Sequence, residues 1–279
     1  MKLWLIRHGM TKGNQEHRYV GTTDEGLLPE EKERLQAKAA NMDLHPAIIF
    51  VSPARRCMET AMCLFSELRG TVESEYAANT GGAVAATAIT AQDPLGLQRI
   101  AGNASGNEVG RKRAGAGATR LIVVPEFMEM NFGVFEYKTY QEINADPDPA
   151  HRAAYQRYID SNGEAAFPDG ESKAAFTKRV CEGFERAVRP RTQALMKAAH
   201  ASAVGETKLG TEPEIVFKLQ DHRSAEDARL ECSGEDIVIV AHGGTIMALM
   251  ERYAEPHKSY FEWSVKPGEG YRLDITYRS

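Results

Sequence analysis

The chain has 279 residues, a formal net charge of −5 and an isoelectric point near 6.0. This charge gives no broad electrostatic affinity for nucleic acid, and no apolar stretch is long enough to span a membrane. The four cysteines match no familiar metal-site spacing, so reduced thiols in a cytoplasmic protein are expected. The first seven residues are expected to be too short for a secretory leader, and the length suits a single domain over residues 1–279.

The first predicted element is a buried strand over residues 3–6, which ends in Arg7-His8-Gly9. Open α/β sheets bind their ligands beyond the carboxyl ends of their strands. An arginine there offers a bidentate fork to phosphoryl oxygens, and a neutral imidazole nitrogen can attack phosphorus. Taken alone, the tripeptide is more often a strand end that turns into a loop.

A surface helix rich in Glu, Lys, Arg, Leu and Ala is predicted over residues 30–42, and an apolar strand over residues 47–51. Ser52 is expected to cap the next helix, with Pro53 in its first turn. The amino terminus of that helix would favour an anion. One of Arg55 and Arg56 is expected to point to the crevice and the other to solvent, although an ordinary capped helix would carry the same residues.

Two segments read as insertions, at about 70–118 and 201–235. The first is rich in alanine and glycine, so a tolerated surface insertion is favoured over a lid that closes on substrate. The second contains a strand-like run over residues 214–219 that could add an edge hairpin. Short helices are predicted over residues 140–144 and 151–159. A longer helical stretch covers residues 171–199, where Pro190 is expected to kink or split it.

Another apolar run, over residues 237–240, is followed by His242-Gly243-Gly244 and leads into a helix over residues 245–250. If this strand neighbours the first, His8 and His242 meet at one rim of the sheet. Residues 270–277 alternate in polarity and predict a last strand at the sheet edge. The alternation of strands and helices predicts an α/β fold, a three-layer sandwich with a mostly parallel central sheet flanked by helices.

These segments together resemble the histidine phosphatase superfamily, whose fold is phosphoglycerate-mutase-like. Arg7-His8-Gly9 matches its nucleophile motif, and residues 52–61 are similar to its Ser-Asp-Leu-x-Arg-Ala-x-x-Thr-Ala segment, which favours Arg56 over Arg55. Residues 129–136 match the segment that carries the family's proton donor. Residues 167–172 resemble its Pro-Gly-Gly-Glu-Ser turn, and residues 241–244 match its second-histidine motif.

The resemblance implies a phosphohistidine on His8, with Glu129 as proton donor and His242 as a further catalytic residue. Glu126 and Glu136 are the other acids that could serve. The resemblance implies that the phosphate is bound by Arg7, Asn14, Arg56, His242 and Gly243. The substrate beyond its phosphate is expected to contact residues of one loop, namely Thr11, Arg18, Tyr19, Gly21 and Thr23; for Arg18 and Tyr19 an ordinary surface loop is an equal alternative.

The resulting hypothesis is a metal-independent phosphomonoesterase for small phosphorylated metabolites, similar to the bacterial α-ribazole-phosphate phosphatases. No cofactor, nucleic acid or membrane is expected as a partner, and the chain is expected to be a monomer or homodimer. The alternative is a phosphoglycerate-mutase-type phosphotransferase, and a non-catalytic phospho-ligand-binding protein is the third possibility. Met10, Glu31, Phe135 and Tyr137 depart from the family pattern, which leaves the identity of the substrate open.

Overall fold

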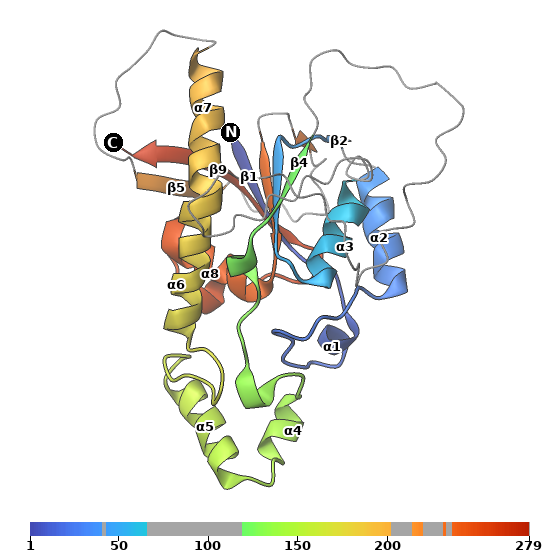
Figure 1. Ribbon diagram of the computed structural model, residues 1–279, viewed down its shortest axis with the longest axis vertical. Coiled ribbons are helices and arrows are strands. Elements are labelled where there is room, and N and C mark those ends of the chain that lie inside the picture. Colours follow the sequence, from blue (N-terminus) through green and yellow to red (C-terminus); the bar gives the residue numbers. More distant parts are fainter. Residues whose placement is uncertain (41–42, 66–118, 202–213, 220–230, 233–235, 279) are drawn as a thin grey trace, which may run out of the picture.

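Seven strands of the described residues form one mixed sheet with helices on both faces (Figure 1). The computed structural model describes residues 1–40, 43–65, 119–201, 214–219, 231–232 and 236–278. The strand order is β4-β3-β7-β1-β9-β5-β8. The strands are β1 (Lys2–Arg7), β3 (Ile48–Val51), β4 (Arg120–Val123), β5 (Glu214–Leu219), β7 (Ile237–Ala241), β8 (Ala254–Glu255) and β9 (Gly270–Arg278), and a separate parallel pair is formed by β2 (Asp43–Leu44) and β6 (Glu231–Cys232).

Strands β4, β3, β7 and β1 run parallel to one another. Strands β3 and β7 are buried along their whole length, as expected for β-branched runs covered on both faces. In the register, Arg7 lies opposite Ala241, and Val51 lies opposite Val240. The carboxyl ends of β1, β7 and β3 therefore lie side by side, and so do the residues that follow them.

The helices divide between the two faces of the sheet (Figure 1). Successive residues of β7 point into different hydrophobic cores, Ile237 and Ile239 into one and Val238 and Val240 into the other. This separation confirms the expected three layers. The helices are α1 (Lys12–Gln15), α2 (Pro29–Ala40), α3 (Arg55–Leu64), α4 (Tyr140–Asn144), α5 (Pro149–Asp160), α6 (Lys173–Gly183), α7 (Arg189–Ala201) and α8 (Gly243–Tyr253), with short turns η3 (Pro125–Phe127), η4 (Gly133–Phe135) and η6 (Tyr260–Trp263).

Several predicted elements are confirmed, among them the helices at 140–144 and 151–159 and the strands that precede the two histidines. These two strands are parallel neighbours, which meets the condition for His8 and His242 to lie at one rim. The stretch over 171–199 is split, as expected near Pro190. A π-helical turn, η5 (Phe184–Val188), separates α6 from α7, and Pro190 is the second residue of α7. None of the described helices is long and apolar enough to cross a membrane.

Two strand predictions were wrong. The last strand, β9, lies inside the sheet between β1 and β5 rather than at its edge. Alternating polarity reports how each face of a strand is covered, and carries no information on whether both edges are paired. The run over 214–219 pairs with β9, far along the chain, and the edge belongs to β8. The predicted insertion at 70–118 and most of that at 201–235 lie outside the described residues.

Candidate active site

The histidines His8 and His242 lie next to each other at the rim of the sheet. His8 follows β1 and His242 follows β7, so the parallel register brings the two together. Their ring centroids are 5.2 Å apart, in an edge-to-face arrangement with 67° between the ring planes. His8 is 3% exposed and His242 is fully buried. Two imidazoles at this depth define the centre of the candidate site.

One ring nitrogen of His8 is left free by its hydrogen bonding. Nδ1 lies 2.8 Å from the carbonyl oxygen of Gly9. Because a carbonyl can only accept, Nδ1 must carry the proton, and Nε2 keeps its lone pair. Burial, followed by the charges of Arg56 and Arg7, holds the pKa of His8 well below its ordinary value. His8 is therefore neutral near pH 7, with Nε2 able to act as a nucleophile.

Two arginines, Arg56 fully buried and Arg7 partly buried, lie in the site and are held by backbone carbonyls. Nη1 of Arg7 donates to the carbonyl of Val265 at 2.7 Å. Arg56 donates from Nη1 to Thr23 and from Nη2 to Gly21, both at 2.8 Å. The Nε atoms of both arginines are buried with no hydrogen-bond partner. Unpartnered buried donors that carry positive charge can be satisfied by an anion.

Arg56 points inward and Arg55 outward, as the motif predicts. Arg55 pairs with Glu59 at 2.9 Å on a partly exposed surface, whereas Arg56 is fully buried. The carbonyls that hold Arg56 belong to the loop of residues 20–23, and that loop is itself held by Glu136. Oε1 of Glu136 accepts from the backbone N–H groups of Gly21 and Thr23, each at 2.9 Å. Glu136 therefore has a task other than proton transfer.

His242 is held by Ser52, which corrects the predicted role of that serine. The Nε2 atom of His242 lies 2.8 Å from Ser52 Oγ. The cap of α3 is Ala54, and no side chain caps this helix. Cys57 Sγ lies 3.6 Å from the same Nε2, and burial raises the pKa of this thiol to about 12, which keeps it protonated. Burial also lowers the pKa of His242 well below its ordinary value, with the charge of Arg56 acting in the same direction.

Glu129 faces this group from the segment that follows β4. Its Oε1 accepts from the N–H of Met130 at 2.9 Å, and its Oε2 accepts from the N–H of Gly244 at 3.1 Å. Burial raises the pKa of Glu129, although the two hydrogen bonds and the charges of Arg56 and Arg7 oppose it. A carboxyl whose pKa is raised by burial, in the same site as Arg56 and Arg7, is suited to hold and transfer a proton.

Glycine is required at position 244 for this approach. A Cβ atom there would lie 2.2 Å from Oε1 of Glu129. At Gly243, by contrast, a Cβ atom would make an ordinary contact of 3.4 Å with the guanidinium carbon of Arg7. The helix predicted over residues 245–250 begins earlier, at Gly243. Both glycines belong to α8, whose N-cap is His242, and no positive φ is found at either.

The loop residues expected to contact substrate have mostly structural partners. Thr11 caps α1 by accepting from the N–H of Asn14 at 3.2 Å, and the side-chain oxygen of Asn14 is buried without a partner. Arg18 forms ion pairs with Glu16 and Glu142 and lies over the Tyr137 ring.

Tyr19 of the same loop shares a 2.6 Å hydrogen bond with Tyr155. Gly21 and Thr23 serve Arg56 through their backbone carbonyls. The structure therefore brings the backbone of this loop to the site through Arg56, whereas the described partners of Arg18 and Tyr19 are loop and α4–α5 residues.

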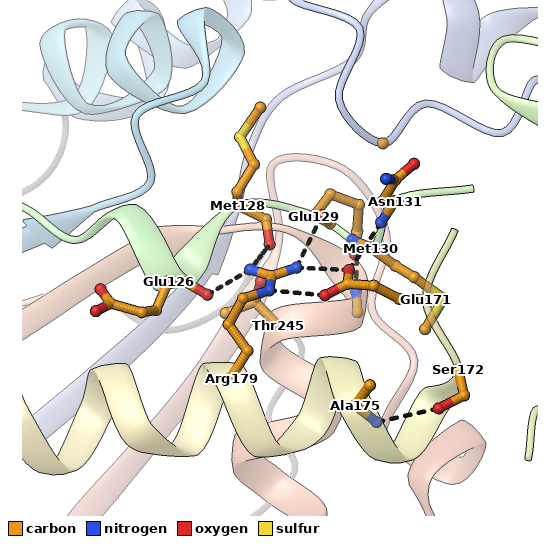
Figure 2. Close-up of polar contacts among 12 residues, drawn as sticks. Glu126, Met128, Glu129, Met130, Asn131, Glu171, Ser172, Ala175, Arg179 and Thr245 are labelled. Atoms are coloured by element: carbon orange, nitrogen blue, oxygen red, sulfur yellow. Dashed lines mark hydrogen bonds and ion pairs between the residues drawn. The ribbon is translucent and has the colours of Figure 1, made fainter. Parts of the chain in front are cut away.

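Other contributors were missed by the sequence analysis. Thr60 accepts from the N–H of Gly9 at 2.9 Å and thus fixes the loop after His8. Arg179 of α6 donates to several carbonyls of the segment that carries Glu129 (Figure 2). Thr60 stands at the threonine of the motif matched to residues 52–61, which was the available signal for it. Arg179 contacts backbone carbonyls outside any quoted motif, so its role could not be seen in advance. Within the ranges that the structure describes, no group of three or more His, Cys, Asp and Glu side chains could hold a metal ion.

Comparison with protein families shows to which family the chain belongs. The model of the histidine phosphatase superfamily (branch 1) matches residues 3–77 and 109–205, well over half of the chain. The chain therefore belongs to the histidine phosphatase superfamily. The matched residues include Arg7, His8, Arg56 and Glu129 but not His242, whose place beside His8 rests on the geometry.

Solved structures share the fold at low sequence identity. A protein from Escherichia coli, provisionally described as an alpha-ribazole-5'-P phosphatase, aligns with a TM-score of 0.55 and 18% identity over 100% of this chain and 94% of its own. The alpha-ribazole phosphatase from Shigella flexneri aligns with a TM-score of 0.54 and 19% identity over 100% and 95%. Identities this low support the fold alone. No curated protein matches the chain significantly in sequence.

Proposed function

We propose that the chain is a metal-independent phosphomonoesterase that acts on small phosphorylated metabolites through a phosphohistidine on His8. The tautomer of His8 supports this proposal most directly, because Nδ1 is bound to the Gly9 carbonyl and Nε2 is free. Membership of the superfamily is compatible with a phosphatase or a mutase. A cytoplasmic location remains an expectation.

In the first step, Nε2 of His8 attacks phosphorus and forms the P–N bond while the P–O bond to the alcohol breaks. The proton of the Glu129 carboxyl passes to the departing oxygen, so the alcohol leaves neutral. Arg7 and Arg56 would neutralise the phosphoryl oxygens, since each has a buried Nε without a partner. The phosphate charge would also favour protonation of His242, which burial and the nearby arginines keep neutral in the free protein.

In the second step, the Glu129 carboxylate takes a proton from water as the water oxygen attacks phosphorus. The P–N bond breaks, the lone pair returns to Nε2 of His8, and inorganic phosphate leaves. Glu129 is again protonated, so the cycle closes without a net change in the protein. Division of one hard displacement into two easier ones is the benefit of a covalent intermediate.

Hydrolysis is favoured over phosphoryl transfer by the surroundings of Arg18. A mutase must bind a second anionic group of its sugar acid, and the loop arginine best placed in sequence to do so is Arg18. Its charge is already paired with Glu16 and Glu142, at 2.6 and 2.8 Å. We take α-ribazole 5′-phosphate as the first substrate to test, because the Escherichia coli protein of the same fold is provisionally described as an alpha-ribazole-5'-P phosphatase.

The experiment is phosphate release from a panel of phosphomonoesters in EDTA, with His8→Ala as the control. The panel holds α-ribazole 5′-phosphate, 3-phosphoglycerate, sugar phosphates, nucleotides and an aryl phosphate. Release in EDTA that is lost in the variant is the expected result. Isomerisation of 3-phosphoglycerate only after addition of a bisphosphate primer would favour the mutase. Binding of phosphate without turnover of any ester would favour a phospho-ligand-binding protein.

A further inference from the structure

The segment that carries Glu129 has little regular structure of its own. It runs from η3 to η4, and residues 129–132 lie in neither helix nor strand. Backbone groups of such a segment must find partners elsewhere if they are shielded from water. Several of these partners are side chains of α6 and of the turn before it.

Arg179 of α6 supplies most of these partners (Figure 2). Its Nη1 donates to the carbonyls of Glu126 and Met128, at 2.8 and 3.0 Å, and its Nη2 donates to the carbonyl of Glu129 at 3.3 Å. The guanidinium also lies over the Phe176 ring, 5.1 Å from its centroid. One planar fork thus fixes three carbonyls within four residues, which an ammonium group could not reproduce.

Glu171 orients the guanidinium of Arg179 and also binds the next peptide group of the segment, at Asn131. Its carboxylate accepts from Nε and Nη2 of Arg179, at 2.9 and 2.8 Å. The same Oε2 that accepts from Nη2 also accepts from the N–H of Asn131 at 2.9 Å. The peptide groups on both sides of Met130 are therefore held, as Figure 2 shows.

These contacts reach the Glu129 carboxyl itself. Its Oε1 is bound by the N–H of Met130, which lies between the Glu129 carbonyl held by Arg179 and the Asn131 N–H held by Glu171. Its Oε2 is bound by the N–H of Gly244 at the start of α8. A displacement of the segment relative to α8 would stretch one of these two bonds to the carboxyl.

We propose that Arg179, oriented by Glu171, is a positioning residue that places the Glu129 carboxyl at the leaving group. This inference rests on the proposed function, in which Glu129 is the proton donor. Arg179 touches the backbone of the segment and is not proposed to touch substrate. The charges that most lower the pKa of Glu129 are those of Arg56 and Arg7, so a change at Arg179 acts mainly through geometry.

The test compares esters whose leaving groups differ in their need for a proton. A nitrophenolate leaves without protonation, whereas a simple alkoxide requires it. We would measure kcat/KM over a series from a nitrophenyl ester to alkyl esters, for the intact protein, Glu129→Gln, Arg179→Lys and Glu171→Gln. Arg179→Lys should lose about tenfold or more with alkyl esters and little with the nitrophenyl ester, in the same direction as Glu129→Gln.

Arg186 provides a matched control. It lies seven positions after Arg179 on the same helical run and forms an ion pair with the side chain of Glu126, at 2.5 Å. Its guanidinium donates to the Glu126 carboxylate, whereas that of Arg179 donates to backbone carbonyls of the segment. Arg186→Lys should leave the leaving-group dependence unchanged. Melting temperatures of all variants would be recorded, and Glu171→Gln, which keeps an acceptor oxygen, serves if Arg179→Lys does not fold.

A uniform loss with every ester in Arg179→Lys and Glu171→Gln would overturn the positioning role, since a general loss of folded protein or of phosphate binding has that signature. An unchanged rate with alkyl esters would overturn it as well. Failure of the proposed function looks different: the intact protein would hydrolyse no ester, or His8→Ala would hydrolyse them all.

Discussion

Replacement of Gly244 by alanine tests the contact between α8, whose N-cap is His242, and the proposed proton donor Glu129. The new Cβ would lie 2.2 Å from Oε1 of Glu129 and 3.1 Å from the Phe176 ring. To restore an ordinary contact of 3.4 Å, Glu129 or α8 must move by about 1.2 Å. A misplacement of about 1 Å at a reacting group costs on the order of 100-fold in rate, or about 2.7 kcal/mol of transition-state stabilisation.

Alanine favours a helix over glycine by up to about 1 kcal/mol, so the free energy of unfolding of Gly244→Ala need not fall with its rate. The assay is kcat with an alkyl phosphate, alongside the melting temperature. Gly243→Ala is the comparison, because its Cβ would make only an ordinary 3.4 Å contact with Arg7. Equal losses in the two variants, or full activity in Gly244→Ala, would refute the reasoning.

Three further predictions concern the surroundings of the reacting groups. The rate with alkyl esters should fall as the pH rises through the pKa of Glu129, which burial raises, because only the protonated carboxyl can donate. In the pH–rate profile of Glu129→Gln this fall should be absent, and only the change due to ionisation of the substrate should remain. A fall that persists in the variant would contradict the assignment. Ser52→Ala should lower the free energy of unfolding in a denaturant titration by about 1–3 kcal/mol, because it leaves the buried Nε2 of His242 with only its weak contact to Cys57 Sγ, whereas an unchanged midpoint would show that the bond to Ser52 matters little. Glu136→Ala should raise KM about tenfold with a smaller effect on kcat, since it releases the loop whose carbonyls hold Arg56, and an unaltered KM in initial-rate measurements would argue against that link.

Much of the site's framework was predictable because its motifs are local. The runs over 3–6 and 237–240 are strands because apolar, β-branched residues suit a sheet covered on both faces, and both runs end in a histidine. Their adjacency was left as a condition by the sequence, and the parallel pairing of β1 with β7 meets it. The choice of Arg56 over Arg55 also came from the motif, and the burial of Arg56 agrees with it.

The errors arose where a residue's partner is distant in the chain. A serine before a helix usually caps it, but the hydroxyl of Ser52 has His242 at 2.8 Å, 190 positions away in sequence. The alternation in β9 revealed its faces and not its two paired edges. Arg18 could be placed in the loop, but its neutralisation by Glu142 depends on how α4 packs against that loop. Arg179 donates to backbone carbonyls, which every residue has, so the sequence around it gave no indication of its partners.

The most direct test of the central claim is to trap the phosphorylated protein. Glu129→Gln would be mixed with a nitrophenyl phosphate, quenched under alkaline conditions that preserve phosphohistidine, digested and analysed by mass spectrometry. Glu129→Gln should accumulate the intermediate, because a nitrophenolate leaves without a proton while the water step lacks its base. The account predicts one phosphoryl group on the peptide that contains His8, and its absence in the His8→Ala, Glu129→Gln double variant. Phosphate release without any phosphopeptide, or a phosphoryl group on another residue, would contradict the account.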